Sequence, residues 1–340
     1  MLAAVTLALA GGGLFELAGI PLPWMLGPML ATTLASMGGA RITVPAAWRT
    51  PAIVVLGLLL GSSFTGDMLA GMPRWLPSLA ALPLYILLIG LLALVYMRLV
   101  ARIDPLSAYF CATPGGLGEM MILGDRMGGD MRLISLVHAT RILLVVFIVP
   151  LAFGLAGFDT GSALDSGPEP AGALDLLVLL GCGVAGAFLG GVLRLPAPGL
   201  LGPMLASAAA HLAGLVDGAP PFALVAAAQL VIGATVGCRF NGVSVASFLW
   251  TVLTGLGLTI LMLLVALLFG VALSWLTGLP TPLLILAYVP GGITEMSVIA
   301  LSLTTDPAFV ATHHIVRIGL VVLMAPMLFR LYRRWARLDG

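Results

Sequence analysis

Two short blocks place a carboxylate directly after a helix breaker in an otherwise apolar chain. The first contains Pro114, Gly115, Gly116 and Glu119, and the second contains Pro290, Gly291, Gly292 and Glu295. Proline removes a backbone donor, and glycine adopts conformations closed to other residues. Within a bilayer, broken backbone is tolerated only where protein or a water-filled cavity satisfies its polar groups. Each block therefore predicts a protected interior site facing a helix N-terminus, which favours anions.

The two carboxylates have several possible roles. A glutamate within a membrane segment is costly unless it is paired or hydrated. Glu119 and Glu295 could carry a proton, coordinate Na⁺ or hold an arginine. In the alternative interpretation, each glutamate caps its own half-helix or pairs with an arginine as a structural strut.

A second repeated pattern is His-x-x-Arg, at His138/Arg141 and His314/Arg317. The spacing puts both side chains of a pair on one helix face. Arginine stays charged and forms bidentate bonds to carboxylate or phosphate. We expect the charges of the two arginines and the two glutamates to balance in one shared cavity. The alternatives are a buried Glu–Arg pair that locks each half separately, or arginine side chains that extend to the membrane–water interface. The histidines either titrate near neutral pH or hydrogen-bond to backbone.

The composition predicts the elements that position these side chains. Of 340 residues, 61% are hydrophobic and only 9% are charged, whereas soluble domains carry about a quarter charged residues. About twelve apolar stretches are long enough for helices, and the alternation of a membrane barrel is absent. The predicted fold class is an all-α integral membrane protein with the lipid bilayer as its partner.

Several function classes are disfavoured. The net charge is +1, and no basic patch could follow a nucleic-acid backbone. Three cysteines and four histidines form no pattern of metal ligands. The sequence also lacks a phosphate-binding loop for ATP and a dinucleotide-binding fingerprint. We therefore expect no nucleic acid, no cofactor, no metal and no enzymatic activity, with an ion or substrate gradient as the energy source.

The chain repeats itself. Residues 20–31 and 195–206 are identical at eight of twelve positions. The blocks GLLLGSSF, Pro-Gly-Gly and His-x-x-Arg also have counterparts in the second half, in the same order and with the same spacing. We predict two tandem membrane repeats, 1–155 and 173–340, joined by a polar linker at 156–172 and forming one membrane domain. The shared LGPM and GxxxG blocks predict close helix packing.

The number of spans in each repeat is open. Each repeat has five to six segments, depending on whether the Pro-Gly-Gly helix spans as one and whether the first two stretches form one kinked unit. An odd number of spans gives inverted repeats, which we favour, and an even number gives parallel repeats. The distribution of arginines does not decide between them.

These blocks carry a family resemblance. IPLPWMLGPML with LPAPGLLGPML, TPGGLGEM with VPGGITEM, and the His-x-x-Arg pairs resemble the AbrB family of duplicated bacterial membrane proteins. The resemblance implies a multi-pass bacterial inner-membrane protein, in a family labelled regulator of gene expression or ammonia monooxygenase. The family is also distantly similar to cation–proton antiporters and anion–sodium symporters, which implies inverted repeats with broken helices around a midplane site.

Together these features predict a secondary transporter, proton- or sodium-coupled, of a small solute such as an organic anion. The alternative is a membrane-embedded regulator of gene expression that acts through a partner. A homo-oligomer is compatible with either function.

Overall fold

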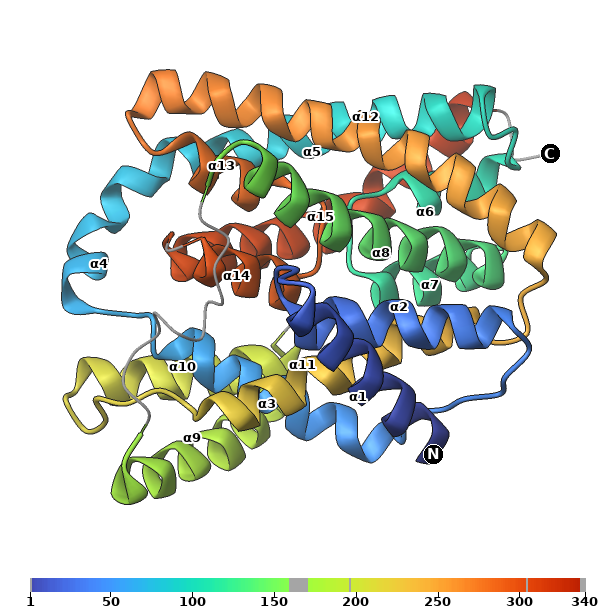
Figure 1. The fold of residues 1–340 in the computed structure, drawn as a ribbon. Helices are drawn as coiled ribbons and strands as arrows, with labels where there is room; N and C mark the ends of the chain where they lie inside the picture. Colours follow the sequence, from blue (N-terminus) through green and yellow to red (C-terminus); the bar gives the residue numbers. More distant parts are fainter. Residues whose placement is uncertain (1, 159–170, 196, 304, 337–340) are drawn as a thin grey trace. The chain divides into compact units, whose positions relative to one another are not determined.

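A computed structural model describes residues 2–158, 171–195, 197–303 and 305–336. Those residues form helices joined by loops, with no strand among them. In the first half of the chain the helices are α1 (Leu2–Leu17), α2 (Pro23–Met37), α3 (Ala46–Gly61), α4 (Gly66–Gly71), α5 (Leu76–Leu99), α6 (Pro105–Ala112), α7 (Leu117–Arg126) and α8 (Met131–Leu155) (Figure 1). In the second half they are α9 (Ala173–Val192), α10 (Pro198–Leu212), α11 (Phe222–Gly237), α12 (Val245–Thr277), α13 (Thr281–Tyr288), α14 (Ile293–Ser302) and α15 (Pro307–Trp335).

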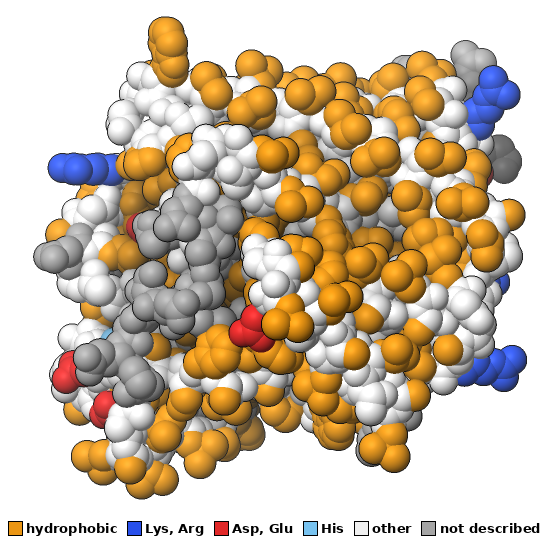
Figure 2. Space-filling model, in the orientation of Figure 1, with side chains coloured by type: hydrophobic (Ala, Val, Ile, Leu, Met, Phe, Trp, Pro, Cys, Tyr) orange, Lys and Arg blue, Asp and Glu red, His pale blue; other side chains and the backbone are white. Residues whose placement is uncertain are grey.

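The helices have the length and composition of a membrane protein. Within the described ranges, six helical segments are long and apolar enough to cross a bilayer. They are Met72–Leu99, Met131–Leu155, Ala173–Val192, Phe222–Phe240, Val245–Thr277 and Pro307–Arg334. Hydrophobic side chains cover most of the face shown in Figure 2, as expected of a surface that faces lipid rather than water. The prediction of an all-α membrane protein is confirmed at this level.

The fifth apolar stretch of each half is two helices rather than one. α6 and α7 divide the stretch predicted at 105–123, and α13 and α14 divide the one predicted at 281–301. The first two stretches, α1 and α2, are separate helices packed against each other: a Cβ on Gly11 would come within 2.5 Å of the Gly27 carbonyl oxygen. The glycines therefore permit backbone-to-backbone packing.

The described chain divides into two compact units. Unit 1 comprises Met1–Arg74, Val146–Val245 and Ile293–Ala311, and unit 2 comprises Trp75–Val145, Ala246–Gly292 and Thr312–Gly340. Each unit takes helices from both halves of the sequence, so the compact units differ from the sequence repeats. Most of the predicted linker, residues 159–170, lies outside the described residues.

Unit 1 is built by exchange of helices between the two sequence halves. α3 packs on α10: a Cβ on Gly57 would lie 2.6 Å from the Leu200 carbonyl oxygen. α11 packs on α2 in the same way, with Gly233 against the Met25 backbone. In each pairing, a GxxxG helix of one half contacts the LGPM helix of the other.

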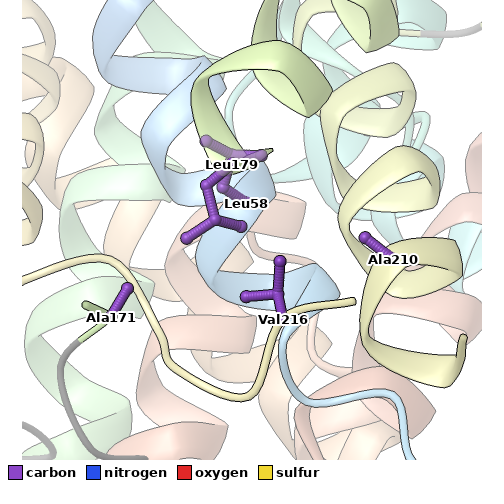
Figure 3. Close-up of a cluster of buried hydrophobic side chains, with 5 residues drawn as sticks. All are labelled: Leu58, Ala171, Leu179, Ala210 and Val216. Carbon is purple, nitrogen blue, oxygen red and sulfur yellow. The ribbon is translucent and has the colours of Figure 1, made fainter. Parts of the chain in front are cut away.

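A small apolar cluster holds the end of the linker in unit 1. Leu58, Leu179, Ala210 and Val216 gather there with Ala171, the first described residue after the linker gap (Figure 3). The Ala171 amide donates to the Ala219 carbonyl over 2.9 Å. Ala171, which lies within the polar linker predicted at 156–172, is thus buried beside residues of α3, α9 and α10. The linker as a whole stays a prediction.

Unit 2 holds the broken helix α6–α7, the helices α5 and α13, nearly all of α12, and the larger parts of α8 and α15. α5 contacts α12 through the Tyr96 hydroxyl, which donates to the Thr254 carbonyl over 3.0 Å. Asp104 is the N-cap of α6, and its carboxylate accepts a hydrogen bond from the Ser107 amide at 2.9 Å. These contacts position the helix ends at which the candidate site is built.

Candidate functional site

The Pro-Gly-Gly blocks lie where two helices end. α6 stops at Ala112 and α7 starts at Leu117; α13 stops at Tyr288 and α14 starts at Ile293. Thr113 and Val289, the first residues after the stops, have extended backbone. Their position leaves the last carbonyls of α6 and α13 without helical partners. We call residues 113–116 the first break and residues 289–292 the second break.

Arginines on the following long helices bind those carbonyls. In the first break, the Arg141 guanidinium donates to the Thr113 and Gly115 carbonyls over 3.5 and 3.2 Å. In the second break, Arg317 donates to the Val289 and Gly291 carbonyls over 2.7 and 2.9 Å. Arg317, Val289 and Gly291 occupy the same positions in the second repeat as Arg141, Thr113 and Gly115 in the first. The same side chain therefore clamps the same backbone in both halves.

The second clamp has two further contacts. Arg317 also donates to the carbonyl of Tyr288, the last residue of α13, over 3.4 Å, and its Nη2 lies 3.1 Å from His314 Nδ1. Arginine has five N–H donors. Arg317 thus makes four hydrogen bonds, whereas Arg141 makes two.

The histidines of the two pairs bind backbone. His138 Nε2 lies 2.9 Å from the Phe110 carbonyl oxygen, and His314 Nε2 lies 3.0 Å from the Leu286 carbonyl oxygen. A carbonyl accepts, so Nε2 carries the proton in both rings. Because Arg317 donates to Nδ1 of His314, that ring is the neutral tautomer. These contacts fix α6 to α8 and α13 to α15.

Arg141 and Arg317 are both buried and lie in one unit. Their side chains are 4% and 2% exposed, and the charge of Arg317 acts electrostatically on Arg141. Neither is paired with a carboxylate among the described residues, and Nε of each has no hydrogen-bond partner. The carbonyl ends of α6 and α13 offset part of this charge.

The glutamates are placed differently from each other. Glu119, in unit 2, is exposed and occupies the third position of α7. Its carboxylate folds back onto Gly116, the N-cap residue, where a Cβ would meet it. Arg141 bonds to carbonyls instead, so the alternative of a Glu–Arg lock is wrong for the first half.

Glu295 belongs to unit 1, where it is partly buried in the first turn of α14. Arg49 and Arg239 act on it electrostatically. The second half of the chain thus gives its glutamate two arginine neighbours that the sequence analysis did not single out. The predicted cavity with two glutamates and two arginines stays a prediction.

Sequence reasoning also missed an aromatic network over the second break. The Tyr85 hydroxyl donates to the Tyr288 carbonyl, which Arg317 also contacts, and the Tyr288 hydroxyl donates to the Ser78 carbonyl. The Ser78 hydroxyl lies 2.8 Å from His313 Nε2. Neither tyrosine has a tyrosine at the equivalent position of the other repeat. The one available signal was a tyrosine two residues before a Pro-Gly-Gly block.

Comparison with known proteins assigns the family. A family profile described as "Transition state regulatory protein AbrB" matches residues 24–333. The chain belongs to the AbrB family. It is 28% identical to the "Uncharacterized protein YhjN" of Bacillus subtilis (strain 168), over 96% of this chain and 91% of that protein. It is 27% identical to the "Putative regulator AbrB" of Escherichia coli (strain K12), over 99% of this chain and 97% of that protein.

In this AbrB chain the two breaks differ in what surrounds them. The first break borders an apolar cavity of about 460 Å³, whose lining includes Tyr109, Thr113 and Pro114. The second break is covered by the aromatic network. The two clamps thus share two equivalent hydrogen bonds to backbone but differ in their surroundings, with an apolar cavity at the first break and the aromatic network at the second.

Proposed function

We propose that this AbrB-family protein is a multi-pass secondary transporter of the bacterial inner membrane that moves a small organic anion, driven by a proton or sodium gradient, and is not an enzyme. The observation that carries the proposal is that Arg141 and Arg317 are both buried and have no carboxylate partner among the described residues. Burial of a charge is costly unless the charge is paired and hydrogen-bonded. A transported anion would supply the missing charge.

The hydrogen bonds suggest different roles for the two arginines. Arg317 uses four of its five donors on protein groups, so we assign it to hold the second break in place. Arg141 uses two and retains three N–H groups for an anion. We therefore propose Arg141 as the main substrate contact, with Arg317 fixing the geometry.

The internal repetition supports a two-repeat transport fold. Equivalent clamps in the two repeats, and the exchange of helices in unit 1, are the features expected of two repeats that assemble into one domain. In transporters with inverted repeats, discontinuous helices hold substrate and coupling ion between the repeats. We propose inverted repeats here, each with one Pro-Gly-Gly-broken helix.

The carboxylates and the tail complete the proposal. Glu119 and Glu295 follow the breaks directly, and we propose that they exchange the proton or sodium ion that drives transport. Arg330, Arg333 and Arg334 lie in the last turns of α15, and excess arginine marks the cytoplasmic side of a membrane protein. The C-terminus is therefore assigned to the cytoplasm.

Reconstitution tests the transport proposal directly. Purified protein in liposomes loaded with a pH-sensitive dye is given a panel of mono-, di- and tricarboxylates, with and without an imposed proton or sodium gradient. We expect at least one acid to give a gradient-dependent signal that is absent from empty liposomes. The signal should be lost in Arg141→Lys and kept in Arg126→Lys, an exposed arginine on α7. No signal across the panel, in protein that is folded and oriented in both directions, would refute the proposal.

A second candidate function is a membrane-embedded regulator. It is favoured by the family description and by the printed name of the E. coli relative. Such a protein would act through a partner that binds its tail or linker. If the protein is a regulator, deletion of residues 337–340 or scrambling of residues 159–170 should change partner capture, and Arg141→Lys should not. If it is a transporter, Arg141→Lys should abolish flux, and the deletion and the scrambling should leave flux unchanged.

A further inference from the structure

The apolar cavity of unit 2 runs between α5 and α15. Its wall is formed by residues of α5, of α6 with the first break, and of α15. The volume of about 460 Å³ falls within the roughly 300–1,000 Å³ of ligand pockets. Among its lining residues, only Tyr109, Thr113 and Tyr332 carry polar side-chain atoms, and the Tyr109 hydroxyl donates to the Ala325 carbonyl over 2.7 Å. The cavity therefore suits an apolar occupant.

The cavity opens towards the surroundings of the helices. Leu91 on α5 and Leu331 on α15 line it, yet their side chains are 59% and 54% exposed. Both helices are among the six membrane-spanning candidates. An occupant can therefore enter sideways from the bilayer. Lipid acyl chains are the apolar molecules present there at the highest concentration.

One end of the cavity is basic. Arg98 follows the lining residue Leu94 by four positions, and Arg334 follows Leu331 by three, so each arginine continues a lining face of its helix by one turn. Both side chains are exposed. Tyr332, a lining residue, lies within electrostatic range of Arg98. A molecule that fits the whole site therefore has an apolar body and an anionic end.

One carboxylate lies near this basic end. Asp104 also acts on Tyr332, but its carboxylate is engaged by the Ser107 amide at the start of α6. Arg98 donates one bond to the Ile103 carbonyl over 2.6 Å, which leaves four of its five N–H donors. Because Arg330, which is exposed near the end of α15, adds a further positive charge, the balance of charge at this end stays positive.

We propose that the cavity holds one acyl chain of an anionic phospholipid, whose headgroup phosphate is bound by Arg98 and Arg334. This site is independent of the transport proposal. It also touches the first break through Thr113 and Pro114. Occupancy therefore stabilises the α6 end that Arg141 clamps.

Two variants separate the chain-binding part from the headgroup-binding part. Gly90 lines the cavity, and a Cβ there meets nothing within 4 Å, so Gly90→Leu fills the space without a backbone clash. Gly181→Leu on α9, also with open space, is its control. Arg98→Gln with Arg334→Gln removes the basic end, and Arg74→Gln with Arg126→Gln, two exposed arginines that do not line the cavity, is the charge-matched control.

The experiment is native mass spectrometry of delipidated protein titrated with phosphatidylglycerol, phosphatidylcholine or inorganic phosphate. Wild-type protein and both controls should bind phosphatidylglycerol more tightly than phosphatidylcholine. Gly90→Leu should bind neither lipid at this site. The double arginine variant should lose about fivefold of the phosphatidylglycerol preference per arginine, the effect of one basic residue at an anionic membrane surface.

Four outcomes would overturn the proposal. Equal affinity for the two lipids would remove the headgroup assignment, and lipid binding that survives Gly90→Leu would remove the cavity assignment. Binding of inorganic phosphate alone with the same dependence on Arg98 and Arg334 would show a free-anion site. A dimer that dissociates on Gly90→Leu, with unchanged lipid retention, would show that a second copy covers the cavity. Equal melting midpoints of Gly90→Leu and Gly181→Leu in lipid-free detergent would show that Gly90→Leu folds.

Discussion

Arg141 and Arg317, at equivalent positions of the two repeats, hold equivalent carbonyls with the same atom. Nη2 of Arg141 donates to Gly115 over 3.2 Å, and Nη2 of Arg317 donates to Gly291 over 2.9 Å. A broken helix in a membrane needs such partners, because lipid offers none. The Pro-Gly-Gly and His-x-x-Arg blocks produce the same arginine–carbonyl contact in both repeats. We infer that this contact is a basic part of the fold. The two copies differ in number, since Arg141 makes two hydrogen bonds and Arg317 makes four.

The first prediction concerns the two clamps. Arg317→Gln should lower the free energy of unfolding more than Arg141→Gln, because it removes four hydrogen bonds rather than two. Each bond to a charged donor contributes about 1.5–3 kcal/mol, so a difference of about 3 kcal/mol or more is expected. Both arginines are almost fully buried, so the desolvation terms nearly cancel in the comparison. Thermal unfolding in detergent gives the order; equal midpoints would show that the extra bonds of Arg317 do not stabilise the fold.

A second prediction addresses the contacts between sequence halves. Gly57→Ala should destabilise the protein by about 1–3 kcal/mol, since its Cβ would press on the Leu200 carbonyl of α10. Gly181→Ala, which faces open space, should instead raise stability by about 0.5–1 kcal/mol through helix propensity. Opposite signs in melting midpoints are the expected result. A stabilising Gly57→Ala would rule out the tight packing of α3 on α10.

A third prediction distinguishes the two glutamates. Glu119→Gln should change stability by less than about 0.5 kcal/mol, because the side chain is exposed and glutamine also serves at this capping position. Glu295→Gln should cost more, because it leaves Arg49 and Arg239 without their neighbouring carboxylate. A double-mutant cycle of Glu295→Gln with Arg239→Gln should give a coupling energy of about 0.5 kcal/mol or more. A coupling energy of zero would show that the charges do not interact.

A fourth prediction tests the aromatic cover of the second break. Tyr85→Phe removes the hydroxyl donor to the Tyr288 carbonyl but keeps the ring contacts with Phe269 and Tyr288. The carbonyl retains Arg317 as a donor, so a loss of about 1 kcal/mol is expected. Tyr96→Phe, on the same helix and less buried, is the control and should cost less. A larger loss for Tyr96→Phe would indicate that the network over the break is not a main support.

The sequence predicted the local features and not the pairing of distant ones. Pro114 and Pro290 marked both breaks, and the class of fold followed from apolar stretches that the structure shows as helices. The carbonyl partners of Arg141 could not be predicted, because formal charge pointed to Glu119. When an arginine hydrogen-bonds to carbonyls at a helix end, residue types do not reveal its partners, because every residue has a carbonyl.

Contacts between halves were equally hidden. The offset of 175 or 176 residues between the repeats shows which positions are equivalent, but it does not show that Gly57 packs on the helix of Leu200 rather than within its own half. Tyr85 escaped notice because its role depends on packing against α13, and it has no counterpart in the other repeat. Comparison of the two repeats identifies residues that they share, and therefore it does not identify a residue such as Tyr85 that occurs in one repeat only.

Ligand binding to the arginine pair tests the central claim most directly. Melting midpoints of purified protein would be measured against a panel of carboxylates, phosphate, amines and metal ions, for wild type, Arg141→Lys, Arg317→Lys and the Arg126→Lys control. Binding to the folded state at a hundredfold excess over the dissociation constant stabilises by about 2.7 kcal/mol. We predict that an organic anion raises the midpoint of wild type and Arg126→Lys and has no effect on Arg141→Lys. An anion whose effect is unchanged in both Arg141→Lys and Arg317→Lys, or a panel in which amines or metal ions alone bind, would contradict the assignment of this pair as an anion site.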